Sequence, residues 1–169
     1  GFRAAEETTS VLVLDVEPPR ADRGAGDIVV VPVSERSLGE WQETSAAGWG
    51  HSSEPARRAA DAYARAAHVL DGDGMVIAVN PIDGRPLGCA SLTFRDNVAT
   101  LGGMSTMPNE RGRGVQSVLI QHRIDVARGL GARIIASSAQ TDSAASSVQP
   151  PRKIERRRKS TCSFGVRWE

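Results

Sequence analysis

The sequence predicts an α+β fold (mixed α/β), in which helices flank a central mixed sheet that is mostly antiparallel and contains one parallel β–α–β unit. Two stretches carry this prediction. Residues 75–107 contain three apolar runs separated by tight turns, which is typical of an antiparallel meander. Residues 106–138 lead from a strand end through a glycine-rich loop and an amphipathic helix into a buried strand. A unit of this size implies a parallel strand pair with a right-handed crossover.

The composition is that of one ordinary globular domain. The 169 residues are 40% hydrophobic and 24% charged. A run of about 18 apolar residues is missing, so we expect no membrane span. The start of the chain lacks a signal-peptide pattern, and we therefore expect a cytoplasmic protein. Cys89 and Cys162 are lone thiols without zinc-site spacing, so we expect no metal.

Two short strands are expected before the first helix. Ser10–Val16 is an apolar run that ends at Glu-Pro-Pro, a sequence that stops a strand. Residues 17–26 have the composition of a linker. Asp27–Val33 is a second β-branched run, and its Pro32 favours a sheet edge because proline cannot donate to a strand ladder.

Two helices follow these strands. Ser34 is a good N-cap for a helix that extends through Gly48. Ser53–Leu70 is alanine-rich and predicts a surface helix, which the sequence Asp-Gly-Asp-Gly at 71–74 ends. Those four residues resemble half of a calcium loop, but the glutamate that such a loop needs is replaced by Ile82. We therefore interpret them as a turn.

The meander and the last helix complete the elements. The three predicted strands are Met75–Asn80, Leu87–Arg95 and Val98–Met107. The pair Gly102-Gly103 inside the third strand indicates a bulge or a close approach of backbone. Apolar residues at roughly helical spacing predict a helix from about Gly112 to Leu130. Gly131 ends it, and Ala132–Ser138 forms the final strand.

The loop Arg111–Gly114 at the start of this helix is suited to hold phosphate. The first N–H groups of a helix lack intrahelical partners, and the helix dipole adds about half a positive charge there. Glycine at 112 and 114 lets an anion approach the backbone. Two alternatives are a solvated loop and a nucleic-acid contact, although a single RGRG without repeats or aromatics is a weak signal for the latter. The fingerprints of dinucleotide-binding and P-loop proteins fail on spacing.

This order of elements resembles the GNAT superfamily of acetyl-CoA-dependent N-acyltransferases. Their cofactor motif, Q/R-x-x-G-x-G/A, stands here as Arg111-Gly112-Arg113-Gly114-Val115-Gln116, and Pro108 occupies the usual turn before it. Gln116 departs from the motif, because most of the superfamily has Gly or Ala there. The resemblance covers roughly residues 27–147.

The resemblance implies acetyl-CoA as co-substrate and acetyl transfer to a primary amine of a small molecule or peptide. In these folds the fourth strand splays from the fifth, and the pantetheine arm inserts between them like an added strand. The diphosphate would rest on the loop N–H groups, and Arg111 and Arg113 would add charge. The implied cofactor-binding residues are Met104, Ser105, Thr106, Arg111, Gly112, Arg113, Gly114, Val115 and Gln116.

The catalytic residues stay unassigned. A common arrangement in the superfamily uses a glutamate on the fourth strand and a tyrosine after the fifth, but residues 98–107 hold no carboxylate and no tyrosine follows Ser138. We expect Tyr63 to pack, and we expect Glu110 to face water. The alternative to an enzyme is therefore a non-catalytic or inactive acyl-CoA-binding module.

The charge pattern divides the chain. Residues 152–169 carry seven Lys/Arg and two Asp/Glu, whereas the rest carries 14 and 18. We expect an N-terminal strand and linker at 1–26, which resembles the end of a preceding GNAT-like lobe, an acetyltransferase domain at 27–147, and an atypical basic tail at 148–169. The tail is either altered in frame or a basic segment that binds nucleic acid or an acidic surface. We favour the altered frame, so nucleic acid is not the expected partner, and a homodimer is left open.

Overall fold

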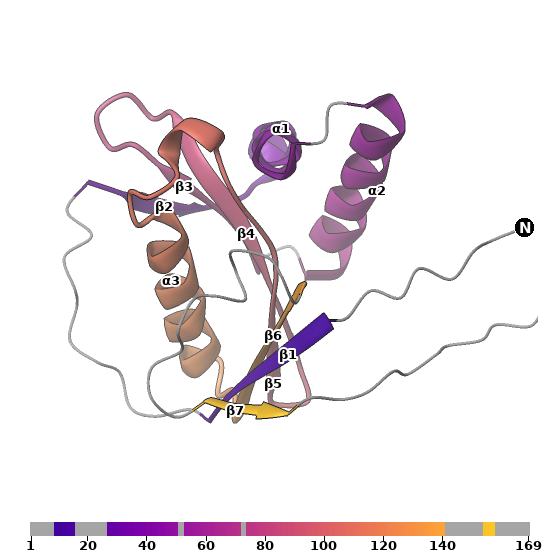
Figure 1. Cartoon of the computed structure of the whole chain (residues 1–169), viewed down its shortest axis with the longest axis vertical. Helices are drawn as coiled ribbons and strands as arrows, with labels where there is room; N and C mark the ends of the chain where they lie inside the picture. The colour runs from indigo at the N-terminus through magenta and orange to yellow at the C-terminus, as the bar shows by residue number, and fades with distance from the viewer. Residues whose placement is uncertain (1–8, 16–26, 51–52, 72–73, 141–153, 158–169) are drawn as a thin grey trace, which may run out of the picture.

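In the computed structural model, residues 9–15, 27–50, 53–71, 74–140 and 154–157 are described (Figure 1). They form one mixed sheet in the order β2-β3-β4-β5-β6-β1-β7. Helices α1 and α2 cover one face and α3 covers the other (Figure 1), which confirms the predicted fold class. The strands are β1 Thr9–Asp15, β2 Val29–Pro32, β3 Met75–Val79, β4 Pro86–Arg95, β5 Val98–Thr106, β6 Ile134–Gln140 and β7 Ile154–Arg157. The helices are α1 Leu38–Trp49, α2 Glu54–Asp71 and α3 Val115–Gly129.

The centre of the sheet is the predicted antiparallel meander of β3, β4 and β5. Four consecutive residues of β3 are buried, because helices cover both of its faces. Met75 and Ile77 pack in a cluster with Trp41 of α1, whereas Val76 and Ala78 pack with residues of α3. At one edge β2 pairs only with β3 among the described strands, which agrees with the edge position expected from Pro32.

The region before α1 differs in detail from the expectation. Residues Glu35–Ser37 form a 3₁₀ turn, and α1 proper begins at Leu38. Ser34 and Ser37 form a capping box around this turn, so the predicted cap is in place even though the first turn is tighter. At the other end Gly50 adopts a left-handed conformation and terminates the helix.

Helix α3 begins three residues later than predicted. Gly112 and Gly114 have φ angles of +78° and +83°, which lie outside the helical region. The glycine loop therefore precedes the helix, and the first helical residue is Val115.

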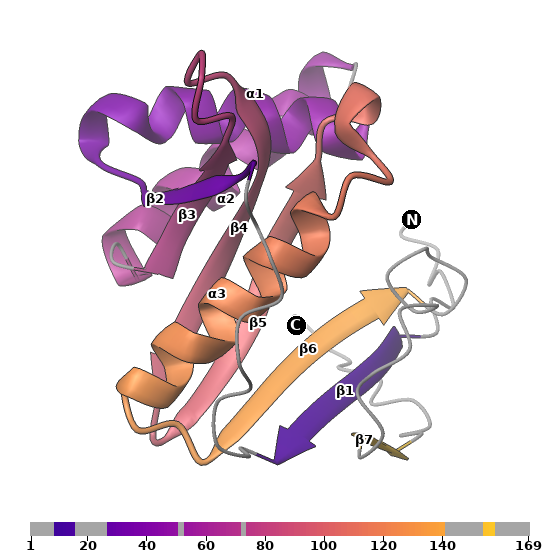
Figure 2. The same cartoon turned by 90° about the vertical axis from the view of Figure 1, so that its left-hand side faces the viewer.

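Strand β6 pairs with a strand on each side, but over different lengths. It runs parallel to β5 only from the pair Val98–Ile134 to the pair Leu101–Ser137. It runs antiparallel to β1 over seven residues. Beyond Leu101 the strands β5 and β6 therefore separate, and Figure 2 shows them side by side at one end and apart at the other.

The irregularity predicted at Gly102-Gly103 is confirmed. The register between β4 and β5 shifts between Cys89 and Ser91, so β5 carries an extra residue there. Gly103 has a φ of +54°, and a Cβ on it would lie 2.8 Å from the Ser91 hydroxyl oxygen. Both requirements favour glycine.

Beyond these elements, β7 was not predicted, and it pairs with β1. The rest of the basic tail, residues 148–153 and 158–169, lies outside the described residues. Among the helices that the structure describes, none is long and apolar enough to cross a membrane.

Candidate functional site

The gap between β5 and β6 lies inside the sheet, where each strand would ordinarily pair with a neighbour along its length. Gly102, Met104 and Thr106 are partly exposed, although residues 87–92 of the neighbouring strand β4 are buried. The N–H of Met107 donates to the carbonyl of Leu87 at 3.0 Å, and Thr106 is the next residue in register, opposite Gly88. Because bonded and non-bonded pairs alternate in antiparallel strands, the N–H and C=O of Thr106 point away from β4, toward the gap.

The glycine loop follows the open end of β5. A 3₁₀ turn at Pro108–Glu110 leads into residues 111–114, all exposed, and then into α3. No side chain of the described residues caps the first turn of α3. A Cβ added to Gly112 or Gly114 would meet nothing within 4 Å, so the space beside both glycines is open. The structure thus places the two predicted groups of cofactor residues, 104–106 and 111–116, at the same end of the sheet (Figure 2).

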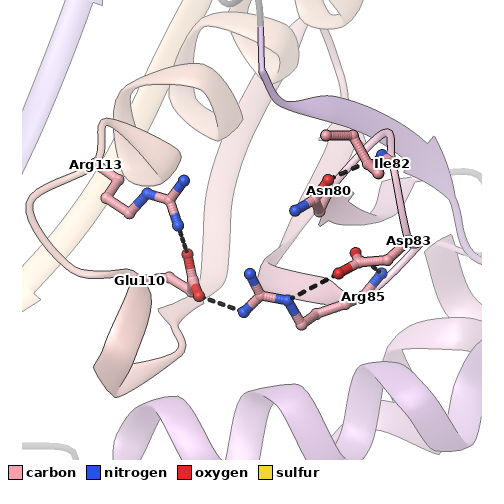
Figure 3. A network of polar contacts seen from close by, with 6 residues as sticks. All are labelled: Asn80, Ile82, Asp83, Arg85, Glu110 and Arg113. Carbon is pink, nitrogen blue, oxygen red and sulfur yellow. Dashed lines mark hydrogen bonds and ion pairs between the residues drawn. The ribbon is translucent and has the colours of Figure 1, made fainter.

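Glu110 does not face water, and that expectation was wrong. It is only 3% exposed. One carboxylate oxygen accepts a hydrogen bond from Arg85, and the other accepts one from Arg113 at 2.6 Å (Figure 3). Hydrogen bonding by Arg85, with the charges of both arginines, lowers the pKa of Glu110.

Both arginines of the loop have internal partners. Arg113 pairs with Glu110, and Arg111 donates from Nη2 to the carbonyl of Gly48, near the end of α1, at 2.9 Å. These contacts hold the loop to α1 and to the β3–β4 hairpin, where Arg85 also contacts Asp83. The arginines therefore brace the loop, in addition to any contact with an anion.

The bulge in β5 is lined by hydroxyl and aromatic groups on the α1–α2 side. The hydroxyls of Tyr63 and Ser91 lie 3.4 Å apart. The rings of Tyr63 and Trp41 stack with centroids 6.4 Å apart, which agrees with the packing role expected for Tyr63. Its side chain is nevertheless half exposed, so its hydroxyl stands beside the bulge rather than in the core.

On the α3 side of the bulge lies Arg123, which the sequence did not single out. Its exposed fraction is 1%, and it donates to backbone carbonyls on both β4 and β5. The only available sequence signal was an arginine on the apolar side of a helix pattern, and such a residue is ordinarily placed at the helix surface.

Burial shifts the pKa of two other titratable groups, Cys89 on β4 and His122 on α3. Burial raises the pKa of the Cys89 thiol to about 11, so this thiol stays protonated at neutral pH. Burial lowers the pKa of His122 on α3. Among the described residues, no cluster of three or more His, Cys, Asp or Glu could hold a metal ion.

A shallow hollow of about 990 Å³ lies along α1, between α2 and the 3₁₀ turn at Pro108–Glu110. Its lining includes Glu43, Asp61 and Glu110. None of residues 102–106 or 111–116 lines it. It is therefore separate from the gap between β5 and β6.

Comparisons with known proteins agree with this fold. Residues 36–147, more than half of the chain, match the Acetyltransferase (GNAT) family. No curated protein is significantly similar to the chain in sequence.

Three solved structures illustrate the likeness of this fold to known proteins. A GCN5-related N-acetyltransferase from Sphaerobacter thermophilus gives a TM-score of 0.70 at 17% identity, over 89% of this chain and 49% of that one. One from Kribbella flavida gives 0.56 at 19% identity, over 79% and 49%. A GNAT acetyltransferase from Brucella melitensis, solved in complex with acetyl-CoA, gives 0.51 at 21% identity, over 63% and 71%. The chain thus spans about half the length of the first two.

These likenesses are too distant in sequence to carry more than the fold, whereas the family match covers the meander, the glycine loop and α3. By that match and that fold, the chain belongs to the Acetyltransferase (GNAT) family.

Proposed function

We propose that this chain binds acetyl-CoA and transfers its acetyl group to a primary amine of a small molecule or peptide. One observation carries the proposal: β5 and β6 separate after Leu101 and Ser137, and the open end of β5 leads directly into an uncapped helix start with two left-handed glycines. An extended amide chain fits the first feature, and a diphosphate fits the second. Family membership supports both.

Within this proposal the residues have distinct tasks. Thr106 offers its outward N–H and C=O to the pantetheine amides, and the neighbouring Met104 and Ser105 shape that edge. Residues 111–116 offer backbone N–H groups to the diphosphate. Val115 is 1% exposed, so it contributes its N–H while its side chain anchors α3 in the core. Acetyl-CoA would supply the acetyl group as a thioester.

Catalysis on this scaffold would rest chiefly on positioning. Bringing the amine and the thioester together in a fixed geometry lowers the barrier without any protein group in covalent contact. Backbone N–H groups freed by the bulge are suited to polarise the carbonyl. We assign no general base, since β5 holds no carboxylate.

The first test is calorimetry with acetyl-CoA on the full chain, together with an assay for free thiol in the presence of a panel of primary amines. Saturable binding with amine-dependent thiol release is the expected result. If acetyl-CoA does not bind at all, the proposal is wrong.

A matched pair of variants tests the loop. Gly114→Asn and Gly114→Asp place isosteric side chains that tolerate a left-handed backbone, and the space around this position is open. We expect the Asp variant to bind acetyl-CoA roughly tenfold or more weakly than the Asn variant, because its carboxylate repels the diphosphate. Equal affinities for the two variants would place the diphosphate elsewhere.

The second candidate function is a non-catalytic acyl-CoA-binding module. It is favoured by the missing carboxylate on β5 and by the missing tyrosine after Ser138. It predicts tight binding of acetyl-CoA without thiol release for any amine in the panel.

A further inference from the structure

Arg123 is a buried guanidinium whose hydrogen-bond partners among the described residues are all neutral. Its Nε donates to the carbonyl of Leu119 at 3.0 Å, one turn back on α3. Its Nη1 donates to the carbonyls of Ser91 at 2.8 Å and Gly102 at 3.1 Å. Its Nη2 donates to the thioether of Met104 at 3.1 Å, a weak acceptor.

The charge of Arg123 is not balanced by a carboxylate. Among the ion pairs of the described residues, none includes Arg123. Burial lowers its pKa to about 10, so the side chain is still charged at neutral pH. A buried charge without a partner is strongly unfavourable, and its retention calls for a compensating role.

The carbonyl groups beside the bulge need hydrogen-bond donors, which explains the hydrogen bonds of Arg123 but not its positive charge. Ser91 and Gly102 are the strand pair that borders the register shift. Their carbonyls need donors, because a buried carbonyl is ordinarily hydrogen-bonded. A neutral amide could donate to them as well. The charge is therefore the feature without a structural explanation.

The position of Arg123 indicates where that charge acts. Two of its acceptors, Gly102 and Met104, belong to β5 immediately after Leu101, the last residue that pairs with β6. Arg123 thus stands at the closed end of the gap. One Nη2 hydrogen faces the thioether of Met104, and the other Nη2 hydrogen has no acceptor among the residues that the structure describes.

We propose that Arg123 supplies the positive potential that stabilises coenzyme A thiolate at the closed end of this gap; the inference rests on the proposed function. In acetyl transfer a bond forms between the amine nitrogen and the acetyl carbon, and the bond from that carbon to sulfur breaks. The electron pair of the broken bond stays on sulfur. The nitrogen loses a proton to water, and the thiolate later takes one from water. Arg123 lowers the energy of the thiolate through space and transfers no proton.

Few other groups can produce the same effect. Strand β5 and residues 134–137 of β6 carry no titratable side chain. In the part of the chain that the structure describes, the titratable groups near this end are Cys89 on β4, Tyr63 on α2 and His122 on α3. The raised pKa of Cys89 keeps its thiol neutral at neutral pH, and burial disfavours the charged form of His122.

The test measures the thiol pKa of free coenzyme A and of coenzyme A bound to the full chain, by the ultraviolet absorbance of the thiolate. Desulfo-coenzyme A complexes serve as blanks for the protein's own thiols. An opposite charge within a few ångströms shifts a pKa by about 1–3 units, so we expect the bound thiol to titrate about one unit or more below the free thiol.

Three variants separate charge from structure. Arg123→Lys keeps the charge and should keep the lowered thiol pKa, whereas Arg123→Gln keeps donors to the carbonyls and should return the thiol pKa toward its free value. Arg133→Gln removes the same charge from an exposed position at the start of β6 and should leave the thiol pKa unchanged. The pH–rate profile should shift in parallel.

The outcomes are distinguishable. Binding of coenzyme A with an unshifted thiol pKa in the wild-type chain overturns this inference alone, even if every Arg123 variant fails to fold. A lowered thiol pKa that persists in Arg123→Gln also overturns it, since the charge would then be dispensable. Absence of coenzyme A binding overturns the proposed function as well.

Discussion

Glu110 and Arg123 are two site residues whose burial depends on contacts with distant parts of the chain. One of the two arginine partners of Glu110 is Arg85, 25 positions away. Arg123 reaches Ser91 and Gly102, 32 and 21 positions away. A charged residue next to a loop or on a helix is ordinarily exposed. These two are buried because the tertiary fold brings distant partners to them. By contrast, the left-handed turns of Gly112 and Gly114 are local backbone features, so a glycine loop before α3 could be predicted from the sequence, although its contact with Gly48 could not.

The Glu110 pairings lead to a prediction about stability against pH. The folded protein holds the pKa of Glu110 below its ordinary value of 4.5, so the ionised carboxylate stabilises the fold wherever it is also ionised in the unfolded chain. That contribution is complete above about pH 4.5 and is lost as the pH falls through the lowered pKa. We expect Glu110→Gln to unfold at a lower temperature than wild type near pH 7, with the difference vanishing in acid.

Thermal unfolding followed by circular dichroism from pH 7 down to pH 3 measures this difference. Asp96→Asn, at an exposed turn, removes a carboxylate elsewhere and serves as the control. A constant gap between wild type and Glu110→Gln across this range would contradict an electrostatic role for Glu110.

Helix α1 and strand β5 meet through glycine at position 48. A Cβ on Gly48 would lie 2.5 Å from the hydroxyl oxygen of Ser105 and 3.1 Å from the amide nitrogen of Thr106. Ser105 itself donates to the carbonyl of Thr44 in α1. The sequence predicted both elements, and it also predicted the bulge in β5 from Gly102-Gly103. It did not predict this contact, because glycine within a helix gives no indication of what approaches it.

Two alanine substitutions in α1 should therefore have opposite effects. Alanine is the better helix former by up to about 1 kcal/mol, and at Gly39, where nothing lies within 4 Å, that preference should raise or maintain stability. At Gly48 the overlap with β5 should dominate and cost about 1–3 kcal/mol. Because α1 must move off the end of β5, Gly48→Ala should also weaken acetyl-CoA binding.

Urea unfolding and calorimetry on both variants give the two quantities. Gly48→Ala that is as stable as Gly39→Ala and binds acetyl-CoA normally would show that the contact between α1 and β5 is unimportant for the site.

Across the whole molecule, the position of β6 depends on a strand from the start of the chain. The parallel β5–β6 unit was predicted from local order, but β1 was expected to belong to a separate N-terminal segment. Instead β1 pairs with β6 along seven residues, whereas β5 pairs with β6 over four. Sequence patterns identify a strand by its own residues, and they carry no signal for which distant strand lies beside it. The same applies to β7, where a charged run pairs with β1.

The gap between β5 and β6 should therefore widen or lose its shape when β1 is disrupted. Leu12 lies opposite Ser137, the last residue of β6 that pairs with β5. Leu12→Pro removes a ladder N–H and restricts the strand. A lost hydrogen bond contributes about 1 kcal/mol, roughly a fivefold change in the local opening equilibrium. We expect amide exchange at residues 134–137 to accelerate by at least that factor and acetyl-CoA binding to weaken. Val30→Pro makes a comparable change in β2, at the opposite edge of the sheet, and should leave exchange at 134–137 slow. If the two variants affect residues 134–137 and acetyl-CoA affinity equally, β1 does not support the gap.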